Sequence, residues 1–262
     1  MRPLLRGSAA LFVALAAVGC SGADMTGPPG TGRLVFQLST SPVGASGGPA
    51  AAADVTVTLG TDVMVISRVQ LVARKIKLER LNGTCPTPVV SEAESGESDA
   101  DLGDTPECPN LRLGPLLLDP PIATGAQTSF SLDLPFGTYH KLEMQIHKPT
   151  GKSSDAAFLA ANPGFAGVSI QVNGTFNGTP FVFTTDLTTE VEVEFATPVE
   201  VKTAGTTSLT LQLDVRGWFL NQGGAGLVSP LALSQQGRQR VEQNIRSSFS
   251  AFEDENHDGR RD

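Results

Sequence analysis

Apolar and polar residues alternate along most of the chain between residues 33 and 220. Alternation of this kind is typical of strands that bury one face and expose the other. In the clearest example, three glutamates at 190–194 alternate with Val191, Val193 and Phe195. We predict strands at 34–38, 55–59, 62–80, 130–134, 139–147, 168–172, 181–183, 190–195 and 209–215.

The long stretch 62–80 changes the phase of its alternation. Apolar residues occupy the odd positions 69, 71 and 73, as Val69, Leu71 and Ala73, and then the even positions of Ile76 and Leu78. Because a slip of one residue moves side chains to the other face, this change predicts a bulge or bend near Arg74–Lys75. Pro135-Phe136-Gly137 and Asn173-Gly174 predict turns. Short strands separated by such turns favour an all-β, antiparallel β-sandwich over a βαβ arrangement.

Residues 221–252 predict a linker followed by an amphipathic helix that packs on the sandwich. Ser229-Pro230 resembles an N-cap followed by proline at the first helical position. Gly237 weakens the first half, so the firm helix is expected to begin near Arg238. Four apolar residues recur at intervals of four, four and three positions, which places them on one helix face: Val241, Ile245, Phe249 and Phe252.

The first twenty residues indicate secretion. Arg2 and Arg6 precede an apolar run from Ala9 to Val18, which is too short to span a bilayer as a helix. Ala17-Val18-Gly19-Cys20 resembles the lipobox of secreted bacterial lipoproteins. The resemblance implies a signal peptide at 1–19, acylation of Cys20 and attachment to the membrane through this lipid, and Ser21 favours the outer membrane. An ordinary cleaved secretory peptide is the alternative.

Residues 20–32 are small, polar and interrupted by prolines, and we expect a flexible tether. A second such region, at 86–107, is rich in acidic residues and is expected to be a disordered loop. It lies between Cys85 and Cys108, the two cysteines that remain once Cys20 is acylated. An even pair in an oxidising compartment predicts a disulfide at the base of this loop.

Charge and motifs narrow the function. The formal charge of −8 argues against nucleic acid as a partner and against adsorption to anionic lipid. No nucleophile elbow, phosphate loop or metalloprotease motif is present. His140 and His147 lie seven positions apart on one predicted strand, so they face opposite sides and cannot share a metal. We therefore expect a protein that is not an enzyme.

The C-terminal segment 253–262 contains a candidate metal site. It reads D-x-N-x-D-G-x-x-D, which resembles the first nine positions of an EF-hand or dockerin calcium loop. Gly259 would allow the sharp turn, and the bidentate glutamate of the twelfth position is missing, so weak Ca²⁺ binding is expected. A solvated polar tail is the alternative. The predicted ligands are Asp254, Asn256, Asp258, Arg260 through its carbonyl, and Asp262.

Three segments carry a resemblance over roughly residues 33–216: VISRVQLVARKIKLE, the expected hairpin LDLPFGTYHKLEMQI, and EVEVEFATPVEVKTAGTTSLTLQLDV. Together they resemble an uncharacterised family of bacterial lipoproteins with a prealbumin-like β-sandwich. The resemblance implies a Greek-key sandwich domain at 33–220 in the cell envelope and supplies no catalytic residue.

We expect a binding or structural module with an unknown protein or polymer partner. One alternative is a module that binds an extracellular polysaccharide or other polymer, and an exposed aromatic row with Trp218 would favour it. Another is an enzyme with an unrecognised site, which a cleft combining His140 with acidic residues would favour.

Overall fold

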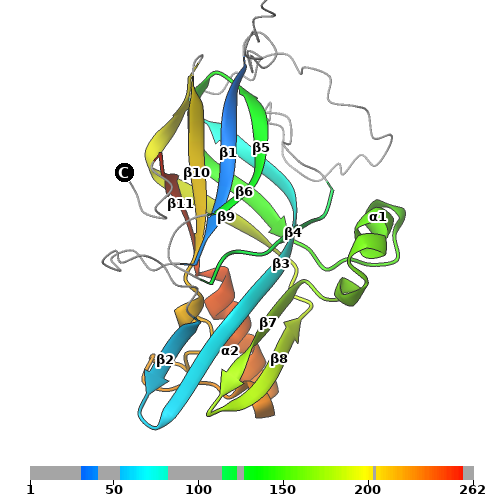
Figure 1. Cartoon of the computed structure of the whole chain (residues 1–262), viewed down its shortest axis with the longest axis vertical. Coiled ribbons are helices and arrows are strands. Elements are labelled where there is room, and N and C mark those ends of the chain that lie inside the picture. Colours follow the sequence, from blue (N-terminus) through cyan, green and yellow to red (C-terminus); the bar gives the residue numbers. More distant parts are fainter. Residues whose placement is uncertain (1–30, 41–53, 82–113, 123–126, 203–204, 256–262) are drawn as a thin grey trace, which may run out of the picture.

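The computed structural model describes residues 31–40, 54–81, 114–122, 127–202 and 205–255 (Figure 1). The strands are β1 (Thr31–Ser39), β2 (Val55–Leu59), β3 (Asp62–Arg80), β4 (Leu116–Leu118), β5 (Gln127–Pro135), β6 (Gly137–Ile146), β7 (Ile170–Phe176), β8 (Thr179–Thr185), β9 (Thr189–Val201), β10 (Thr206–Leu213) and β11 (Phe249–Glu253). The helices are α1 (Ser153–Ala161) and α2 (Gln235–Arg246), with 3₁₀ turns η1 (Pro163–Phe165), η2 (Val215–Gly217) and η3 (Pro230–Ala232).

These strands form two sheets, which is consistent with the expected sandwich-like fold. The four-stranded sheet has the order β11-β10-β1-β5, and the seven-stranded sheet has the order β8-β7-β3-β6-β9 with β2 and β4 also paired to β3. The strands pair antiparallel, as predicted, with the exception of β1 and β10, which pair in parallel. Strands so far apart in sequence need no tight turn between them, so either direction is open to them.

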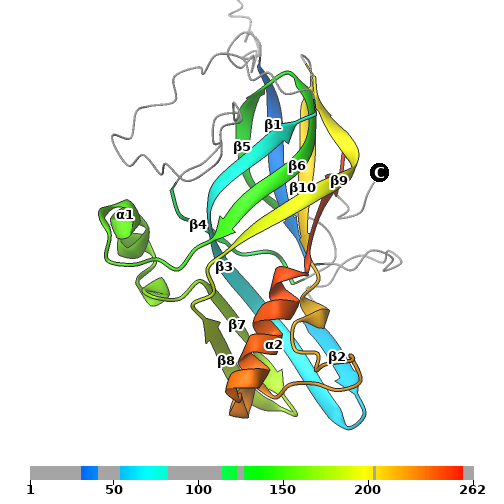
Figure 2. The ribbon, with the colours of Figure 1, turned by 180° about the vertical axis from the view of Figure 1, so that it is seen from behind.

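The strand β3 is long enough to belong to two different parts of the molecule. Its first part pairs with β2 and β7, and its last part pairs with β6. Around the last part, β6 and β9 pack against the four-stranded sheet; we call this the sandwich half. Around the first part, α2 covers one face of β2, β3, β7 and β8; we call this the helix half (Figures 1 and 2).

The bulge predicted near Arg74–Lys75 is confirmed. The register of β3 against β6 shifts between Arg74 and Lys77, and Lys75 has a φ of 52°. Just before the bulge, Leu71, Val72 and Ala73 are all buried, so both faces of the strand are covered there. The bulge therefore lies where β3 passes from the helix half to the sandwich half, and it changes the face that meets the core.

The LPFGTY segment does not form the expected hairpin. β5 belongs to the four-stranded sheet and β6 to the seven-stranded sheet, so the turn at Phe136 carries the chain from one sheet to the other. The Tyr139 hydroxyl donates a hydrogen bond to the Pro135 carbonyl at 2.7 Å, and the Arg80 guanidinium donates to the Phe136 carbonyl. Gly137 has a φ of 150°, and a Cβ there would overlap this guanidinium. These contacts explain the residue types in the turn.

The predicted turn at Asn173-Gly174 is also wrong, because both residues lie inside β7. The hairpin turn is four residues later, at Asn177-Gly178, where φ is 50° and 78°. Positive φ at both central residues is the geometry that favours Asn-Gly in tight hairpins. A Cβ on Gly174 would overlap the Val65 carbonyl, so this glycine permits close approach of two strands instead.

The C-terminal helix is present but shorter than predicted. Val241 and Ile245 are fully buried on one face of α2, as expected. Phe249 and Phe252 instead lie on β11, where they pair with Leu213 and Thr210 of β10. The helix ends at Arg246 because the chain then joins the edge of the four-stranded sheet, and unpaired backbone groups at that edge are satisfied by β11.

The start of α2 also differs from the prediction. The N-cap is Ser234, whose hydroxyl accepts a hydrogen bond from the Gly237 N–H at 3.0 Å. Ser229 precedes the short turn η3 and makes no capping hydrogen bond. The helix therefore includes Gly237. A Cβ there would lie 3.1 Å from a methyl of Val228, so glycine lets the helix pack closely on this segment.

Candidate functional site

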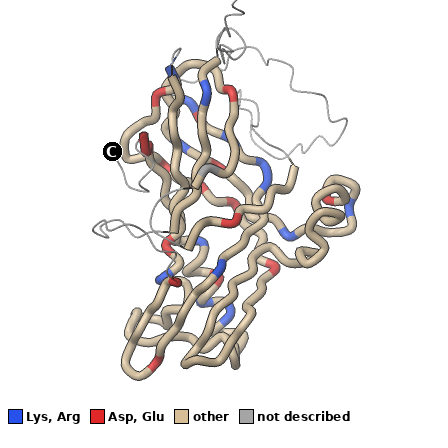
Figure 3. The backbone as a smooth tube through the Cα atoms, in the orientation of Figure 1, with Lys and Arg blue, Asp and Glu red and all other residues tan. Residues whose placement is uncertain are grey.

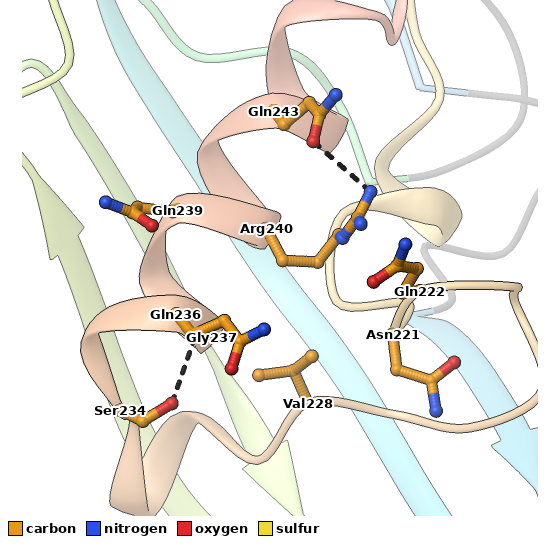
Figure 4. Close-up of a pocket in the computed structure, with 9 residues that line it drawn as sticks. All are labelled: Asn221, Gln222, Val228, Ser234, Gln236, Gly237, Gln239, Arg240 and Gln243. Atoms are coloured by element: carbon orange, nitrogen blue, oxygen red, sulfur yellow. Dashed lines mark hydrogen bonds between the residues drawn. The ribbon is translucent and has the colours of Figure 1, made fainter.

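A pocket of about 420 Å³ lies between the first turns of α2 and the segment that precedes it (Figure 4). Seven of its nine lining residues are polar, five of them carry a side-chain amide, and Val228 provides an apolar wall. The lining residues are Asn221, Gln222, Val228, Ser234, Gln236, Gly237, Gln239, Arg240 and Gln243.

The wall opposite the helix is a glycine-rich loop with a defined shape. Leu220 and Leu227 form an isolated β-bridge at its base. The Asn221 N–H donates to the Gly226 carbonyl at 2.9 Å, and the Asn221 side-chain oxygen accepts from the Gly226 N–H at 3.2 Å. Gly223 has a φ of 95°, which a residue with a side chain rarely adopts. These bonds hold this wall of the pocket in place.

Asn244 of α2 joins the helix to the opposite wall. Its side-chain nitrogen donates to the carbonyls of Trp218 and Leu220, at 3.1 Å and 2.9 Å. Trp218 is fully buried, and its indole N–H donates to the Ser248 hydroxyl at 2.8 Å. Because the two walls are bonded to each other and to the core, the pocket is formed before any ligand arrives.

The opposite side of α2 is bonded to β8. The Thr185 hydroxyl donates to Glu242 at 2.6 Å, and the Arg238 guanidinium donates to the Thr184 carbonyl at 2.7 Å. Arg238 also lies over the ring of Phe183, with its Cζ 5.4 Å from the ring centre. These contacts fix the rotation of the helix about its axis. Residues Gln236, Arg240 and Gln243 follow one another at helical spacing and therefore face the pocket together.

The chemistry of the lining suits binding. A side-chain amide offers both donors and an acceptor, so the amides can pair with hydroxyls, peptide groups or other amides. Arg240 is the one ionisable side chain of the lining, and it donates from Nη1 to the Gln243 oxygen at 3.2 Å. A guanidinium stays protonated in proteins and cannot serve as a general base. The lining thus offers recognition without an acid–base pair.

The charge near the pocket differs from the charge of the chain. The sequence carries a formal charge of −8, whereas α2 contains three arginines and one glutamate. Elsewhere acidic and basic residues are interspersed along the strands (Figure 3). Lys141, for example, bonds to Glu79 on β3 and lies near Glu192 on β9. The helix is therefore a local cationic element in an acidic protein.

A second polar cluster joins α1 to the end of β6. His147 Nε2 lies 2.9 Å from the Asp155 carboxylate, and the Thr150 N–H donates to the same carboxylate at 2.7 Å. Burial lowers the pKa of His147, although the carboxylate opposes this effect. Burial also acts to raise the pKa of Asp155, but the bonds from Thr150 and His147 outweigh it and the pKa falls. The cluster fixes the start of a short helix.

Several predicted site residues lie outside the described part of the chain. These are the acylation site Cys20, the cysteines Cys85 and Cys108, and the calcium-loop residues Asn256, Asp258, Arg260 and Asp262. Asp254 is described and is fully buried beside the four-stranded sheet. Its carboxylate accepts from the Thr210 hydroxyl at 3.0 Å, and its N–H donates to the Ser208 carbonyl at 3.2 Å.

Two alternative functions depended on particular residues: polymer binding on an exposed Trp218, and catalysis on a cleft that combines His140 with acidic residues. The structure places neither residue in such a site. Trp218 is buried in the core and presents no exposed aromatic surface. His140 lies 3.8 Å from Glu79 on the face of the seven-stranded sheet, and it does not line the pocket. Its Nδ1 is buried without a hydrogen-bond partner.

Within the described ranges, no group of three or more His, Cys, Asp or Glu residues is placed to hold a metal ion. Of the helices in the same ranges, none is both long and apolar enough to cross a bilayer. No protein-family model matches the chain, and neither a curated protein nor a solved structure matches it significantly.

Sequence reasoning missed the pocket because it placed the polar face of α2 in solvent. The helical spacing leaves Arg240 outside the apolar face of Val241 and Ile245, and the glutamines near it match no motif. Two signals were present in the sequence. One is the concentration of glutamine at 235–243, and the other is the glycine-rich segment 221–226 just before it.

Proposed function

We propose that this protein is a non-catalytic binding module of the bacterial cell envelope, held at the membrane by a lipid on Cys20. The observation that carries the binding role is the amide-lined pocket beside α2, with Arg240 as its one ionisable side chain. Such a lining recognises a polar ligand by hydrogen bonds and lacks the groups for proton transfer.

Binding is tested by filling the pocket. Gln236 is exposed and lies in the pocket beside Val228 (Figure 4), so Gln236→Trp adds bulk there without disturbing the core. Gln235→Trp is the matched control, because Gln235 is exposed, begins the same helix and does not line the pocket.

Calorimetric titrations would use neutral hexasaccharides, oligogalacturonates and glutamate peptides as probes. Affinity for one probe should fall at least tenfold in Gln236→Trp and by less than twofold in Gln235→Trp. Binding that is equal in the two variants, or absent for all probes, would refute the pocket as the binding site.

The lipid anchor is supported by the charged start, the short apolar run and the small residues before Cys20. The small, polar residues after Cys20 would serve as the tether, and of the predicted range 20–32 the last two residues belong to β1, which begins at Thr31. Labelled palmitate should enter the wild type and not Cys20→Ser, and the label should be found in the outer membrane fraction. Equal labelling of both proteins would contradict the anchor and leave an ordinary secretory peptide.

We further propose that the two sheets form a prealbumin-like Greek key and that Cys85 and Cys108 form a disulfide. A prealbumin-like Greek key is supported by two sheets in which β1 lies between β10 and β5, strands distant in sequence. Two cysteines at the ends of one acidic segment support a Cys85–Cys108 bond. Mass mapping without reduction should find these two peptides joined, and two free thiols after oxidative purification would disprove the bond.

We also propose weak Ca²⁺ binding at Asp254, Asn256, Asp258, Asp262 and the Arg260 carbonyl. The spacing D-x-N-x-D-G-x-x-D supports the site, because alternate oxygen-bearing residues and a glycine for the sharp turn are what a calcium loop needs.

The test of the calcium site should spare Asp254, because its replacement would also break a buried hydrogen bond. Titration with millimolar Ca²⁺ should give heat in the wild type and none in Asp258→Ala with Asp262→Ala. If the wild type gave no heat, the calcium site would be refuted and the alternative, a solvated polar tail, would hold for this segment.

A further inference from the structure

We propose that the pocket recognises the carboxylate of a hydroxyl-rich ligand, an oligosaccharide that contains uronic acid, and that Arg240 binds this carboxylate. The inference rests on the proposed function of the pocket as a binding site, and it names the chemical class of the ligand. A carboxylate on a sugar would meet one cation and several amides in the same cavity.

Arg240 is placed to bind an anion inside the pocket. Its side chain is half-buried and extends from α2 toward Gln222 on the opposite wall (Figure 4). It donates from Nη1 to Gln243, and a guanidinium has five N–H donors in a planar fork. That fork matches the two oxygens of a carboxylate, and the charge-assisted bonds formed in this way are stronger than neutral ones.

The charges around Arg240 favour the binding of an anion in the pocket. No lining residue is acidic. Arg238, on the side of α2 that is bonded to β8, adds positive charge to the same helix. Glu242 is the acidic residue of α2, and its carboxylate is directed to Thr185 on the other side of the helix.

The number of cations argues for a carboxylate. A phosphate group brings nearly two negative charges and is usually met by several basic groups. The lining offers one guanidinium, which balances the single charge of a carboxylate.

The other lining groups argue for a sugar over an acidic peptide. Each sugar hydroxyl both donates and accepts, as does each amide of Asn221, Gln222, Gln236, Gln239 and Gln243. An extended peptide is commonly bound along a free sheet edge, with apolar pockets for alternate side chains. This pocket has no strand edge in its lining, and Val228 is its one apolar side chain large enough to receive such a group.

The experiment compares trigalacturonic acid with its methyl ester, which differs by the absence of charge. Calorimetry is carried out on the wild type, Arg240→Gln and Arg246→Gln. Arg246 is exposed on the same helix and does not line the pocket, so its variant controls for the loss of one positive charge.

The acid should bind the wild type at least about tenfold more tightly than the ester, as expected for hydrogen bonds to a charged group. Arg240→Gln should reduce the affinity for the acid to that for the ester. Arg246→Gln should change both affinities by less than about twofold.

Three results would overturn the proposal. In the first, trigalacturonic acid and its methyl ester bind equally and both lose affinity in Gln236→Trp. The pocket would then bind sugars without distinguishing a carboxylate from its ester. In the second, triglutamate binds with the same dependence on Arg240 and the sugars do not bind, which would show that the ligand of the pocket is an acidic peptide. In the third, no probe depends on Gln236, and the binding function of the pocket itself then fails.

Discussion

The sandwich half and the helix half share the strand β3 but cover it in different ways. In the sandwich half, β3 and its neighbours β6 and β9 meet a second sheet, and the glutamates of β9 face outward while Val191 and Val193 are buried. In the helix half, the same strand meets α2, and the segment around Trp218 and Phe219 fills the space between them.

This difference explains where the pocket lies. Two sheets that pack face to face match each other along their whole length, and their loops are at the ends. A helix is a narrow cylinder on a broad sheet, so the chain that leads into it must fill the space at its side. Here that chain is the glycine-rich loop at 221–226, and it leaves a polar cavity against α2.

The largest effect is expected from Trp218→Ala in the helix half. Trp218 is fully buried, and loss of a large aromatic side chain from a core costs about 3–5 kcal/mol of unfolding free energy. Chemical denaturation would measure this change. Because one continuous core cluster includes Trp218 and the sandwich residues Leu34 and Leu211, the variant should still unfold in a single transition. Two separate transitions would show that the halves are independent units.

A smaller effect is expected from Gly137→Ala at the turn between the two sheets. The substitution would place a Cβ against the Arg80 guanidinium at a φ of 150°, and we expect a loss of roughly 1–3 kcal/mol. Gly164→Ala is the control, because a Cβ there meets nothing within 4 Å, and it should change stability by less than about 0.5 kcal/mol. Equal losses in the two variants would argue against this role of Arg80.

The two candidate caps of the C-terminal helix give a third test, within the helix half alone. Ser234→Ala removes the hydrogen bond to the Gly237 N–H and should cost about 1 kcal/mol. Ser229→Ala should cost less than about half of that, since Ser229 makes no capping bond. Thermal unfolding of the two variants would compare them, and the reverse order would place the helix start where the sequence predicted it.

The smallest effect concerns pH and the cluster that fixes α1. Burial holds the pKa of His147 below its usual value, so the unfolded chain binds a proton before the folded chain does. Stability should therefore fall as the pH drops below about 6.5, by less than about 1 kcal/mol over the first pH unit. His147→Gln should make the stability flatter over this range. A wild-type protein that becomes more stable from pH 7.5 to 5.5 would contradict the burial of a neutral histidine.

The strands were predictable because the alternation of apolar and polar residues within each strand indicates which of its faces is buried. The alternation at 190–195, the phase change near Arg74 and the segments around Leu34 and Leu209 are all local patterns, and the structure confirms them. The predictions failed where a local pattern fits two structures. Asn-Gly occurs at 173–174 and at 177–178, and the strand pairing chose the second.

The same ambiguity affected the C-terminal segment and hid the candidate site. Val241, Ile245, Phe249 and Phe252 have helical spacing, but the last two lie on β11 and pair with β10. The polar face of α2 is suited to solvent or to a binding pocket, and the glycine-rich segment 221–226 does not by itself show that it will face this helix. Of the predicted metal ligands, Asp254 alone falls within the described residues.

The sequence by itself determined the all-β class, the places of most strands, the bulge in β3 and the burial of one face of α2. These features follow from the periods of two and 3.6 residues, which each segment carries locally. The tertiary structure decided the parallel pairing of β1 with β10, the passage of β5 and β6 into different sheets, and the pocket at Arg240. These features depend on which distant segments meet, and the free energy of such contacts belongs to pairs of segments that no single stretch of sequence contains.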